Sequence, residues 1–425
     1  PGVAKANKPR LAVVSPLPPE HSGIADYSAE LLLELERHYG VELVLTPGAT
    51  PDTSLSRFPQ RDVAYFERHG ASYDRVLYHF GNSNVHKHMF ALLRRIPGTV
   101  VLHDFYLSGV LDNMERDGDV PEAFLQALYA SHGYTGLHYH AEHGRNPSIW
   151  QYPCNKEVLD RAAGVIVHSD FSRRLAEQWY GPGAAEGWRT IPLLRGQVAQ
   201  DADHLAARTA ARARLGLGED DYIVSAYGML GPTKLNHRLL DAFLASPLAS
   251  DPHCKLVFVG ANDPGQYGIE LLRKIADSEA AARIRITGFV SSTDYQHWLA
   301  ASDCPVQLPT QTRGETSASV LDCLMHGLPA IVNAHGASAD LPRDTLCMLQ
   351  DSFEDAELSP ALAELHASQA RRAELARLGR AHIARHHAPA AVGALYVGAI
   401  GAFARDSAPG LPRQLVATLT APPAP

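Results

Sequence analysis

The sequence has few cysteines: five in 425 residues, and no two of them form a CxxC pair. This count argues against a disulfide scaffold, and the scattered positions do not indicate a zinc site built from cysteines. We therefore expect a reducing compartment, and the cytoplasm is the natural assignment.

The sequence also lacks an apolar run of about 18 residues and a signal peptide at its start, so we expect no membrane span. It has no basic excess: 38 Lys and Arg stand against 46 Asp and Glu, for a net charge of −8. A broad nucleic-acid surface is therefore not expected. Glycine and proline, at 33 and 29, are too few for collagen or a disordered repeat. The length predicts two or three domains.

Short apolar runs alternate with helical runs in the first half of the chain. The predicted strands, which have polar residues at or near their ends, are 10–15, 41–45, 74–80, 98–103 and 164–169. The predicted helices are 24–37, 85–95, 121–132 and 170–179. This alternation predicts a parallel sheet covered by helices on both faces.

A break at 192–220, with one helix at 203–215, separates this series from a second one. Its predicted strands are 222–227, 255–259, 284–287, 304–308 and 329–332. Its predicted helices are 235–244, 268–276, 295–301, 317–326, 360–366 and 369–386, and a further helical run covers 390–403.

We therefore expect an α/β fold with two doubly wound, Rossmann-like domains that face each other across a cleft. The first domain is predicted at 1–195, joined by a C-terminal helix that crosses back at 390–425, and the second at 196–389. Ligands of such sheets bind at the carboxyl ends of the strands.

Four loops at strand ends carry residues suited to chemistry. The run His21-Ser22-Gly23 opens a helix, where free backbone amides suit an anion. His103 and Asp104 end a buried strand. Lys234 follows a glycine-containing loop, and Glu315 precedes a helix that starts near Ser317; both arrangements suit a phosphate or a sugar hydroxyl. Each loop also has a plain structural interpretation, as a helix cap or a solvated charge.

Histidine is the one compositional oddity, with 22 copies. His132, His138, His140 and His143 lie close together in the sequence, among glycines that favour a loop. The cluster lacks Asp, Glu or Cys at a known ligand spacing, so we do not expect a metal site there.

Taken together, these segments resemble the retaining nucleotide-sugar glycosyltransferases of family 4, which have the GT-B fold. The resemblance runs from Leu11 to about Ala404. The order and spacing of several segments carry it: 16–27, 80–86, 100–104, 168–169, 227–234, 288–290 and 313–329.

The resemblance implies that the first half binds the acceptor and the second half binds the donor. It implies catalytic roles for His103, Lys234 and Glu315, with Lys234 on the diphosphate. The donor contacts implied are Gly23, Gly228, Thr233, Lys234, Phe289, Val290, Glu315, Thr316, Ser317 and Asp322. The acceptor contacts implied are Asp26, Tyr27, Asn82, His86 and Asp104.

Three departures from the family pattern affect the donor contacts. Gly314 stands where the first of two spaced glutamates belongs, one residue before Glu315. The second acid is Asp322, one methylene shorter, and Met229 replaces an arginine that usually precedes the lysine. The diphosphate charge would then be met by Lys234, helix amides and Arg313 or Arg195.

The resemblance implies retaining, metal-independent transfer of a mannose- or glucose-type hexose from a sugar nucleotide, GDP-mannose or a UDP-sugar, to a glycan or lipid-linked acceptor. The usual family setting is bacterial polysaccharide synthesis. We expect no cofactor and no nucleic-acid partner. We expect a cytoplasmic protein with peripheral contact at the inner face of the cytoplasmic membrane. Alternatives are a sugar-nucleotide 2-epimerase, a phosphorylase, or a non-catalytic sugar-nucleotide-binding subunit.

Overall fold

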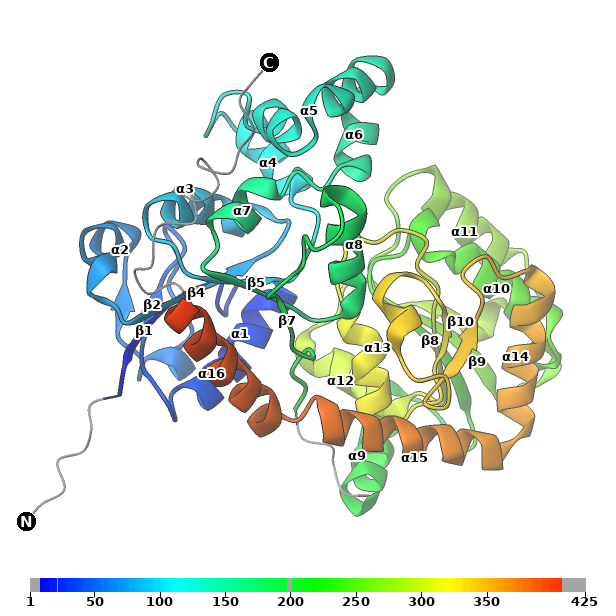
Figure 1. Ribbon diagram of the computed structural model, residues 1–425. Coiled ribbons are helices and arrows are strands. Elements are labelled where there is room, and N and C mark those ends of the chain that lie inside the picture. The colour runs from blue at the N-terminus through cyan, green and yellow to red at the C-terminus, as the bar shows by residue number, and fades with distance from the viewer. Residues whose placement is uncertain (1–7, 21, 197–200, 407–425) are drawn as a thin grey trace, which may run out of the picture. The chain divides into compact units, whose positions relative to one another are not determined.

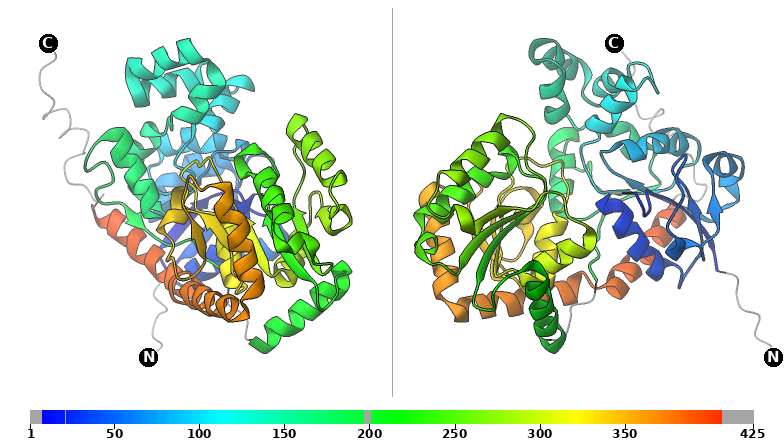
Figure 2. Two further views of the ribbon diagram at one scale, coloured as in Figure 1. Left: turned by 90° about the vertical axis from the view of Figure 1, so that its right-hand side faces the viewer. Right: turned by 180° about the vertical axis from the view of Figure 1, so that it is seen from behind.

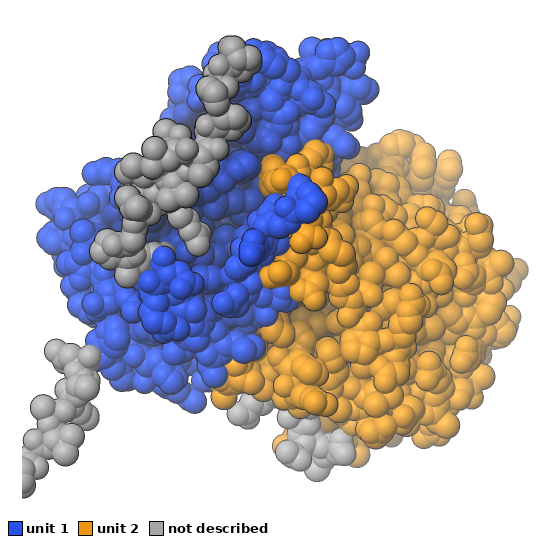
Figure 3. Space-filling view, in the orientation of Figure 1, with its two compact units in different colours: residues 1–167, 181–191, 393–425 blue, residues 168–180, 192–392 orange. Residues whose placement is uncertain are grey.

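The computed structural model describes residues 8–20, 22–196 and 201–406, with side chains from residue 203 onward in the last range (Figure 1). These residues form two compact units. Unit 1 comprises residues 1–167, 181–191 and 393–425, and unit 2 comprises 168–180 and 192–392 (Figure 3). The cleft expected between the two halves stays a prediction.

Unit 1 contains a seven-stranded parallel sheet in the order β3-β2-β1-β4-β5-β6-β7. Its strands are β1 (Arg10–Val14), β2 (Gly40–Val44), β3 (Gln60–Arg61), β4 (Arg75–Phe80), β5 (Thr99–Leu102), β6 (Gly164–Val167) and β7 (Arg189–Thr190). The order runs outward from β1 in both directions, so right-handed crossovers place helices on both faces. The central strands are apolar because both faces are covered.

The helices of unit 1 are α1 (Gly23–Leu35), α2 (Val63–His69), α3 (Lys87–Arg95), α4 (Ser108–Arg116), α5 (Ala123–His143), α6 (Arg145–Gln151), α7 (Lys156–Arg161) and most of α16 (Pro389–Asp406). The predicted loop around the histidine cluster is wrong. These residues belong to α5, which continues through a kink at Gly133, where φ is +61°. Glycine adopts this non-helical conformation without strain, so two helical segments of α5 meet at Gly133.

Unit 2 contains a six-stranded parallel sheet in the order β10-β9-β8-β11-β12-β13. Its strands are β8 (Tyr222–Tyr227), β9 (Cys254–Val259), β10 (Ile284–Ile286), β11 (Cys304–Gln307), β12 (Ile331–Asn333) and β13 (Cys347–Leu349). Its helices are α8 (Asp170–Tyr180), α9 (Asp201–Leu215), α10 (Asn236–Ala245), α11 (Gln266–Ala276), α12 (Ser292–Ala301), α13 (Ala318–Met325), α14 (Asp355–Ala367) and α15 (Gln369–His386). Figure 2 shows helices flanking this sheet in both views.

Helix α8 groups with unit 2, although the sequence pattern put it in the first half. Its first turn is tied to loops of unit 2. The Phe171 amide donates to Asp340 Oδ2 (3.0 Å), Arg174 pairs with the same carboxylate (2.6 Å), and Ser172 Oγ donates to the Gly314 carbonyl (2.9 Å). These partners lie far along the chain, so local periodicity carries no sign of them.

The C-terminal helix α16 returns to unit 1, as predicted, over the residues described. Its Tyr396 is fully buried and shares a hydrogen bond of 2.7 Å with the Tyr27 hydroxyl of α1. Gly164 leaves room for Phe403, because a Cβ there would lie 2.1 Å from that ring. The remainder of the predicted segment, 407–425, lies outside the described residues.

The stretch Gln369–Asp406 reaches the length and apolar composition of a membrane-spanning helix, with a hydropathy of 1.4 over its best 18-residue window. In the structure it consists of α15 and α16, which are separated at His387 and Ala388. Val392, Tyr396 and Ile400 are at most 1% exposed. Packing within the protein accounts for these three residues, and 39% of the apolar window is buried.

Candidate functional site

Unit 2 has a cavity of about 180 Å³ at the carboxyl ends of its central strands. Four of the predicted donor residues line it: Lys234, Glu315, Thr316 and Ser317. They come from two loops, one after β8 and one between β11 and α13. Because the strands are parallel, both loops emerge at the same edge of the sheet.

The first loop holds Lys234 through backbone geometry. Gly228 turns the chain at the end of β8 with φ of +106°, a conformation that glycine adopts without strain. The Gly231 amide donates to Asn236 Oδ1 (3.0 Å), and the Thr233 carbonyl accepts from the Thr310 amide (2.9 Å). Lys234 is exposed, and none of the acidic residues that the structure describes forms an ion pair with it. It therefore offers an uncompensated cation at the cavity.

The second loop fixes Glu315 against its own backbone. Its Oε2 accepts from the Arg313 amide (2.5 Å) and the Thr312 hydroxyl (2.9 Å). Gly314 permits this turn with φ of +83°. Within the described part of the chain, Oε1 has no hydrogen-bond partner. Oε2 thus stabilises the loop, and Oε1 can accept a hydrogen bond from a ligand hydroxyl.

Helix α13 begins at this loop and points its first turn at the cavity. Ser317 is the N-cap, and its Oγ accepts from the Val320 amide (3.4 Å). Thr316 Oγ1 is buried and has no hydrogen-bond partner among the described residues. Burying a hydroxyl without a hydrogen-bond partner is costly, so we expect a bound ligand to supply that partner. The free amides of a helix N-terminus suit an anion.

His335 also lines the cavity, and the sequence analysis missed it. It follows β12, and its Nδ1 lies 2.8 Å from Asp351 Oδ1. Its Nε2 is buried and has no partner among the described residues. A signal was present in the sequence, because the polar residues Asn333 and His335 follow the predicted strand 329–332, much as His103 ends a predicted strand.

Asp322, predicted to contact a ribose, lies further along α13 and does not line the cavity. The Tyr295 hydroxyl donates to its Oδ2 (3.0 Å), and Arg195 Nε lies 3.2 Å from Oδ1. Burial raises the pKa of the Asp322 carboxyl, and Arg195 and Tyr295 oppose that rise. Arg195 therefore forms an ion pair with Asp322, and its contact with a diphosphate stays a prediction. The ribose contact stays a prediction.

The predicted donor residues Thr233, Phe289 and Val290 do not line the cavity. Thr233 precedes Lys234. Phe289 is 80% exposed, and Val290 follows it in the loop between β10 and α12. Gly288 turns that loop with φ of +76°. Their contact with a base stays a prediction.

In unit 1, His103 and His79 meet at the ends of adjacent strands. His103 Nε2 lies 2.9 Å from His79 Nδ1, and His79 is fully buried. The Tyr27 ring packs edge-on against His103, with centroids 5.1 Å apart. His103 is 8% exposed, so its ring is held in place by neighbours on two sides. This arrangement fits a positioned side chain.

The predicted acceptor residues of unit 1 divide into two sets. Asp26 is exposed, and Asn82 and Asp104 are half-buried, with the Asn82 amide donating to Asp104 Oδ2 (2.7 Å). Tyr27 and His86 are buried, and His86 Nδ1 lies 3.0 Å from the His79 carbonyl. Burial lowers the pKa of His86 to about 3. These two side chains pack within unit 1, and their contact with an acceptor stays a prediction.

Gly23 opens α1, and Ser22 caps the helix by accepting from the Ile24 amide (3.2 Å). Gly23 is exposed, and a Cβ there would meet nothing within 4 Å. His21 lies outside the described residues. The predicted diphosphate contact at Gly23 stays a prediction.

The histidine cluster on α5 does not assemble a metal site in the described structure. His132 Nε2 accepts from the Cys154 amide (3.3 Å), and His140 Nδ1 lies 3.3 Å from Ser148 Oγ. His143 faces the Tyr139 carbonyl (3.1 Å), and His138 pairs with Glu142 (3.3 Å). Each of the four rings thus contacts a different neighbour, and the rings do not converge on one point.

Comparison with known proteins supports the assignment of the fold. The Anabaena protein HepE (Alr3699), crystallised with UDP, is 17% identical, with a TM-score of 0.64 over 92% of this chain and 100% of that one. A glycosyltransferase from Rickettsia africae is 11% identical, with a TM-score of 0.65 over 95% and 100%. Sucrose-phosphate synthase from Thermosynechococcus elongatus is 17% identical, with a TM-score of 0.62 over 97% and 100%.

At these identities the likeness concerns the fold, and the two parallel-sheet units match the GT-B glycosyltransferase structures. A search of curated proteins finds no match. Residues 207–382 match the family model described as "Glycosyl transferases group 1". That segment includes Lys234, Glu315, Thr316, Ser317 and His335. The chain therefore contains a Glycosyl transferases group 1 domain, and this domain makes it a glycosyltransferase.

Proposed function

We propose that this chain transfers a hexose from a nucleoside diphosphate sugar to a glycan or lipid-linked acceptor. The observation that carries the proposal is the cavity of unit 2. It combines the uncompensated Lys234, the first turn of α13 and the unpartnered Thr316 hydroxyl. A cation beside free helix amides is a binding site for phosphate on physical grounds.

Similar structures support this donor class. HepE was crystallised with UDP and with UDP-glucose, and a sucrose-phosphate synthase has the same fold. We propose UDP-glucose and GDP-mannose as the first donors to test. The sugar hydroxyls would meet Glu315 Oε1 and His335 Nε2, which line the same cavity.

We propose that transfer proceeds with retention and without a catalytic metal. Negative charge develops on the departing diphosphate, and Lys234 with the α13 amides would stabilise it. A front-face reaction needs no enzyme nucleophile. His103 of unit 1, oriented by His79, would contact the transferred sugar, and Asp26, Asn82 and Asp104 would contact the acceptor.

The experiment that tests this function follows the anomeric proton of the product by NMR. Wild-type protein, candidate donors and short glycan acceptors are incubated with EDTA. Retained configuration and undiminished rate support the proposal. An inverted product contradicts retention, and a rate restored only by Mg²⁺ or Mn²⁺ contradicts metal independence. An epimerase would act without acceptor, and a phosphorylase would make or consume sugar 1-phosphate.

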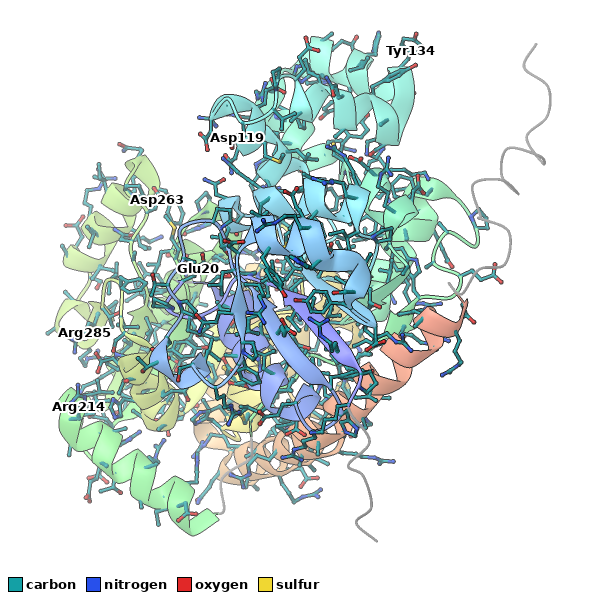
Figure 4. The ribbon with its side chains drawn as sticks, turned by 90° about the vertical axis from the view of Figure 1, so that its left-hand side faces the viewer. Glu20, Asp119, Tyr134, Arg214, Asp263 and Arg285 are labelled. Atoms are coloured by element: carbon teal, nitrogen blue, oxygen red, sulfur yellow. The ribbon has the colours of Figure 1, made fainter. Side chains whose placement is uncertain are left out.

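We also propose peripheral membrane contact through the outer part of α5. Tyr134 is 77% exposed and points outward (Figure 4), and Tyr129 lies edge-on to it, with centroids 5.4 Å apart. Exposed tyrosines suit a membrane interface. Co-sedimentation with anionic vesicles, reduced in the double variant Tyr129→Ser and Tyr134→Ser, would support this contact. Equal co-sedimentation of both proteins would contradict it.

A further inference from the structure

Unit 2 carries a second cluster of polar side chains at the opposite edge of its sheet. Cys254 is the first residue of β9, whereas the donor loops follow the carboxyl ends of the strands. Asp251 follows the short helix η5 (Pro247–Ser250), and His366 lies in the last turn of α14. One donor atom from each of these three residues lies within 4.8 Å of the other two.

The distances fit a tetrahedral metal centre. Cys254 Sγ lies 3.4 Å from His366 Nε2, and Nε2 lies 3.7 Å from Asp251 Oδ2. Zinc binds sulfur at about 2.3 Å and nitrogen or oxygen at about 2.0–2.2 Å, which puts tetrahedral ligands roughly 3.3–3.6 Å apart. The third pair, Cys254 Sγ and an Asp251 carboxylate oxygen, lies within 4.8 Å, so a bound cation would draw these two side chains closer together.

Contacts around the cluster hold the Asp251 carboxylate, the His366 ring and the nearby backbone in place. Asp251 Oδ1 accepts from the His253 amide (2.8 Å), so Oδ2 faces His366. The His366 ring packs edge-on against Tyr222, with centroids 4.7 Å apart. Arg283 Nη1 donates to the carbonyls of Asp251 (2.9 Å) and Cys254 (2.8 Å), which holds the two backbone segments together. Oriented ligands of this kind favour metal affinity.

The same residue types could instead form a nucleophilic Cys-His-Asp relay, but the geometry opposes it. In a relay the thiol and the carboxylate face different ring nitrogens. Here both face Nε2 of His366.

We propose that Asp251, Cys254 and His366 bind one divalent zinc ion. The thiolate and the carboxylate together neutralise the ion's charge, and the thiol proton is released on binding. The Asp251 and His366 side chains are 34% and 31% exposed, so water can complete the tetrahedron. The ligands come from segments 112 residues apart, and the ion would fasten α14 to the start of β9. This role is structural and separate from sugar transfer.

The test uses the full chain, freed of metal and titrated with Zn²⁺ and then with Co²⁺. We expect one tightly held zinc per chain by mass spectrometry of the desalted protein, and a melting temperature raised by several degrees, because the ion binds the folded state. With Co²⁺ we expect a thiolate-to-metal charge-transfer band. Cys254→Ser should abolish this band, while Cys347→Ser, at another free cysteine, should keep it.

Two further variants decide the matter even if Cys254→Ser does not fold. His366→Ala should lower zinc affinity at least about tenfold, and His253→Ala, at the neighbouring exposed histidine, should not. The proposal is overturned if the wild-type protein shows no charge-transfer band. It is also overturned if His366→Ala binds zinc as tightly as His253→Ala. Neither result would bear on the proposed transferase function, because the zinc ligands lie at the other edge of the sheet from the donor cavity.

Discussion

His335 Nδ1 lies 2.8 Å from Asp351 Oδ1, and the opposite ring nitrogen is buried at the cavity of unit 2 without a partner among the described residues. The carboxylate favours a proton on Nδ1, and Nε2 is left to exchange a hydrogen bond with a ligand. We predict that His335→Ala lowers kcat/KM for the donor by about tenfold to a hundredfold, since a buried hydrogen bond is lost. Asp351→Asn should give a smaller loss, because it disturbs only the orientation of the ring. Steady-state kinetics with saturating acceptor checks both values, and equal activity in His335→Ala and the wild type would remove His335 from the site.

Lys234 should have a large effect on donor use. Lys234→Ala removes the uncompensated cation, so we expect kcat/KM for the donor to fall by about a hundredfold or more. Lys274→Ala is the matched control, because Lys274 pairs with Asp241 on the surface of unit 2. The control should retain wild-type kinetics. Near-normal turnover in both Lys234→Ala and Glu315→Ala would contradict the assignment of this cavity.

Thr316 allows a test in which stability and binding move in opposite directions. Thr316→Val removes a buried hydroxyl that has no partner within the described protein. The free energy of unfolding should stay the same or rise slightly, since no internal hydrogen bond is lost. Nucleotide affinity should fall by about tenfold. Calorimetric titration and urea unfolding measure the two quantities. A variant that is less stable but binds normally would assign the hydroxyl a purely structural role.

His103 and His79 should act on turnover rather than on donor binding. His103→Ala is expected to lower kcat while the nucleotide affinity stays near that of the wild type. His79→Phe keeps a ring in the buried space but removes the 2.9 Å contact, so its loss should be smaller than that of His103→Ala. Equal nucleotide affinities together with an unchanged kcat in both variants would exclude the pair from the reaction.

Buried neutral histidines should make the protein sensitive to acid. Burial lowers the pKa of His86 to about 3, and an unfolded histidine titrates near about 6.5. Between these values the unfolded chain binds a proton that the folded chain does not, so the free energy of unfolding falls as the pH falls through this window. Above about 6.5 the contribution is complete. Urea unfolding at several pH values should show a shallower slope in His86→Gln than in His138→Gln, which changes an exposed histidine. Identical slopes would contradict this effect of burial.

Much of the fold and part of the site followed from the sequence for a common physical reason. Parallel strands are short apolar runs, and their loops emerge at one edge, so Lys234 and Glu315 could be brought together by counting strands. His335 follows the predicted strand 329–332, but its partner Asp351 follows β13, a strand that the sequence pattern did not predict.

Long-range contacts explain the remaining differences. Helix α8 joins unit 2 through Asp340, 166 residues from Arg174. Two helical segments of α5 meet at a kink at Gly133, and the glycine count alone does not show that a helix resumes after it. The proposed ligands Cys254 and His366 are 112 residues apart, so no short sequence motif could predict that they meet. Each of these depends on tertiary packing and not on local pattern.

Nucleoside diphosphate binding tests the account most directly. UDP, GDP and ADP are titrated calorimetrically into the wild-type protein, Lys234→Ala and Lys274→Ala, all in EDTA. We predict that one of these nucleotides binds the wild-type protein and the Lys274→Ala control equally, and binds Lys234→Ala at least about tenfold more weakly. Absence of binding by all three nucleotides, or equal affinity in Lys234→Ala and the wild type, would contradict the claim that the cavity of unit 2 holds the donor.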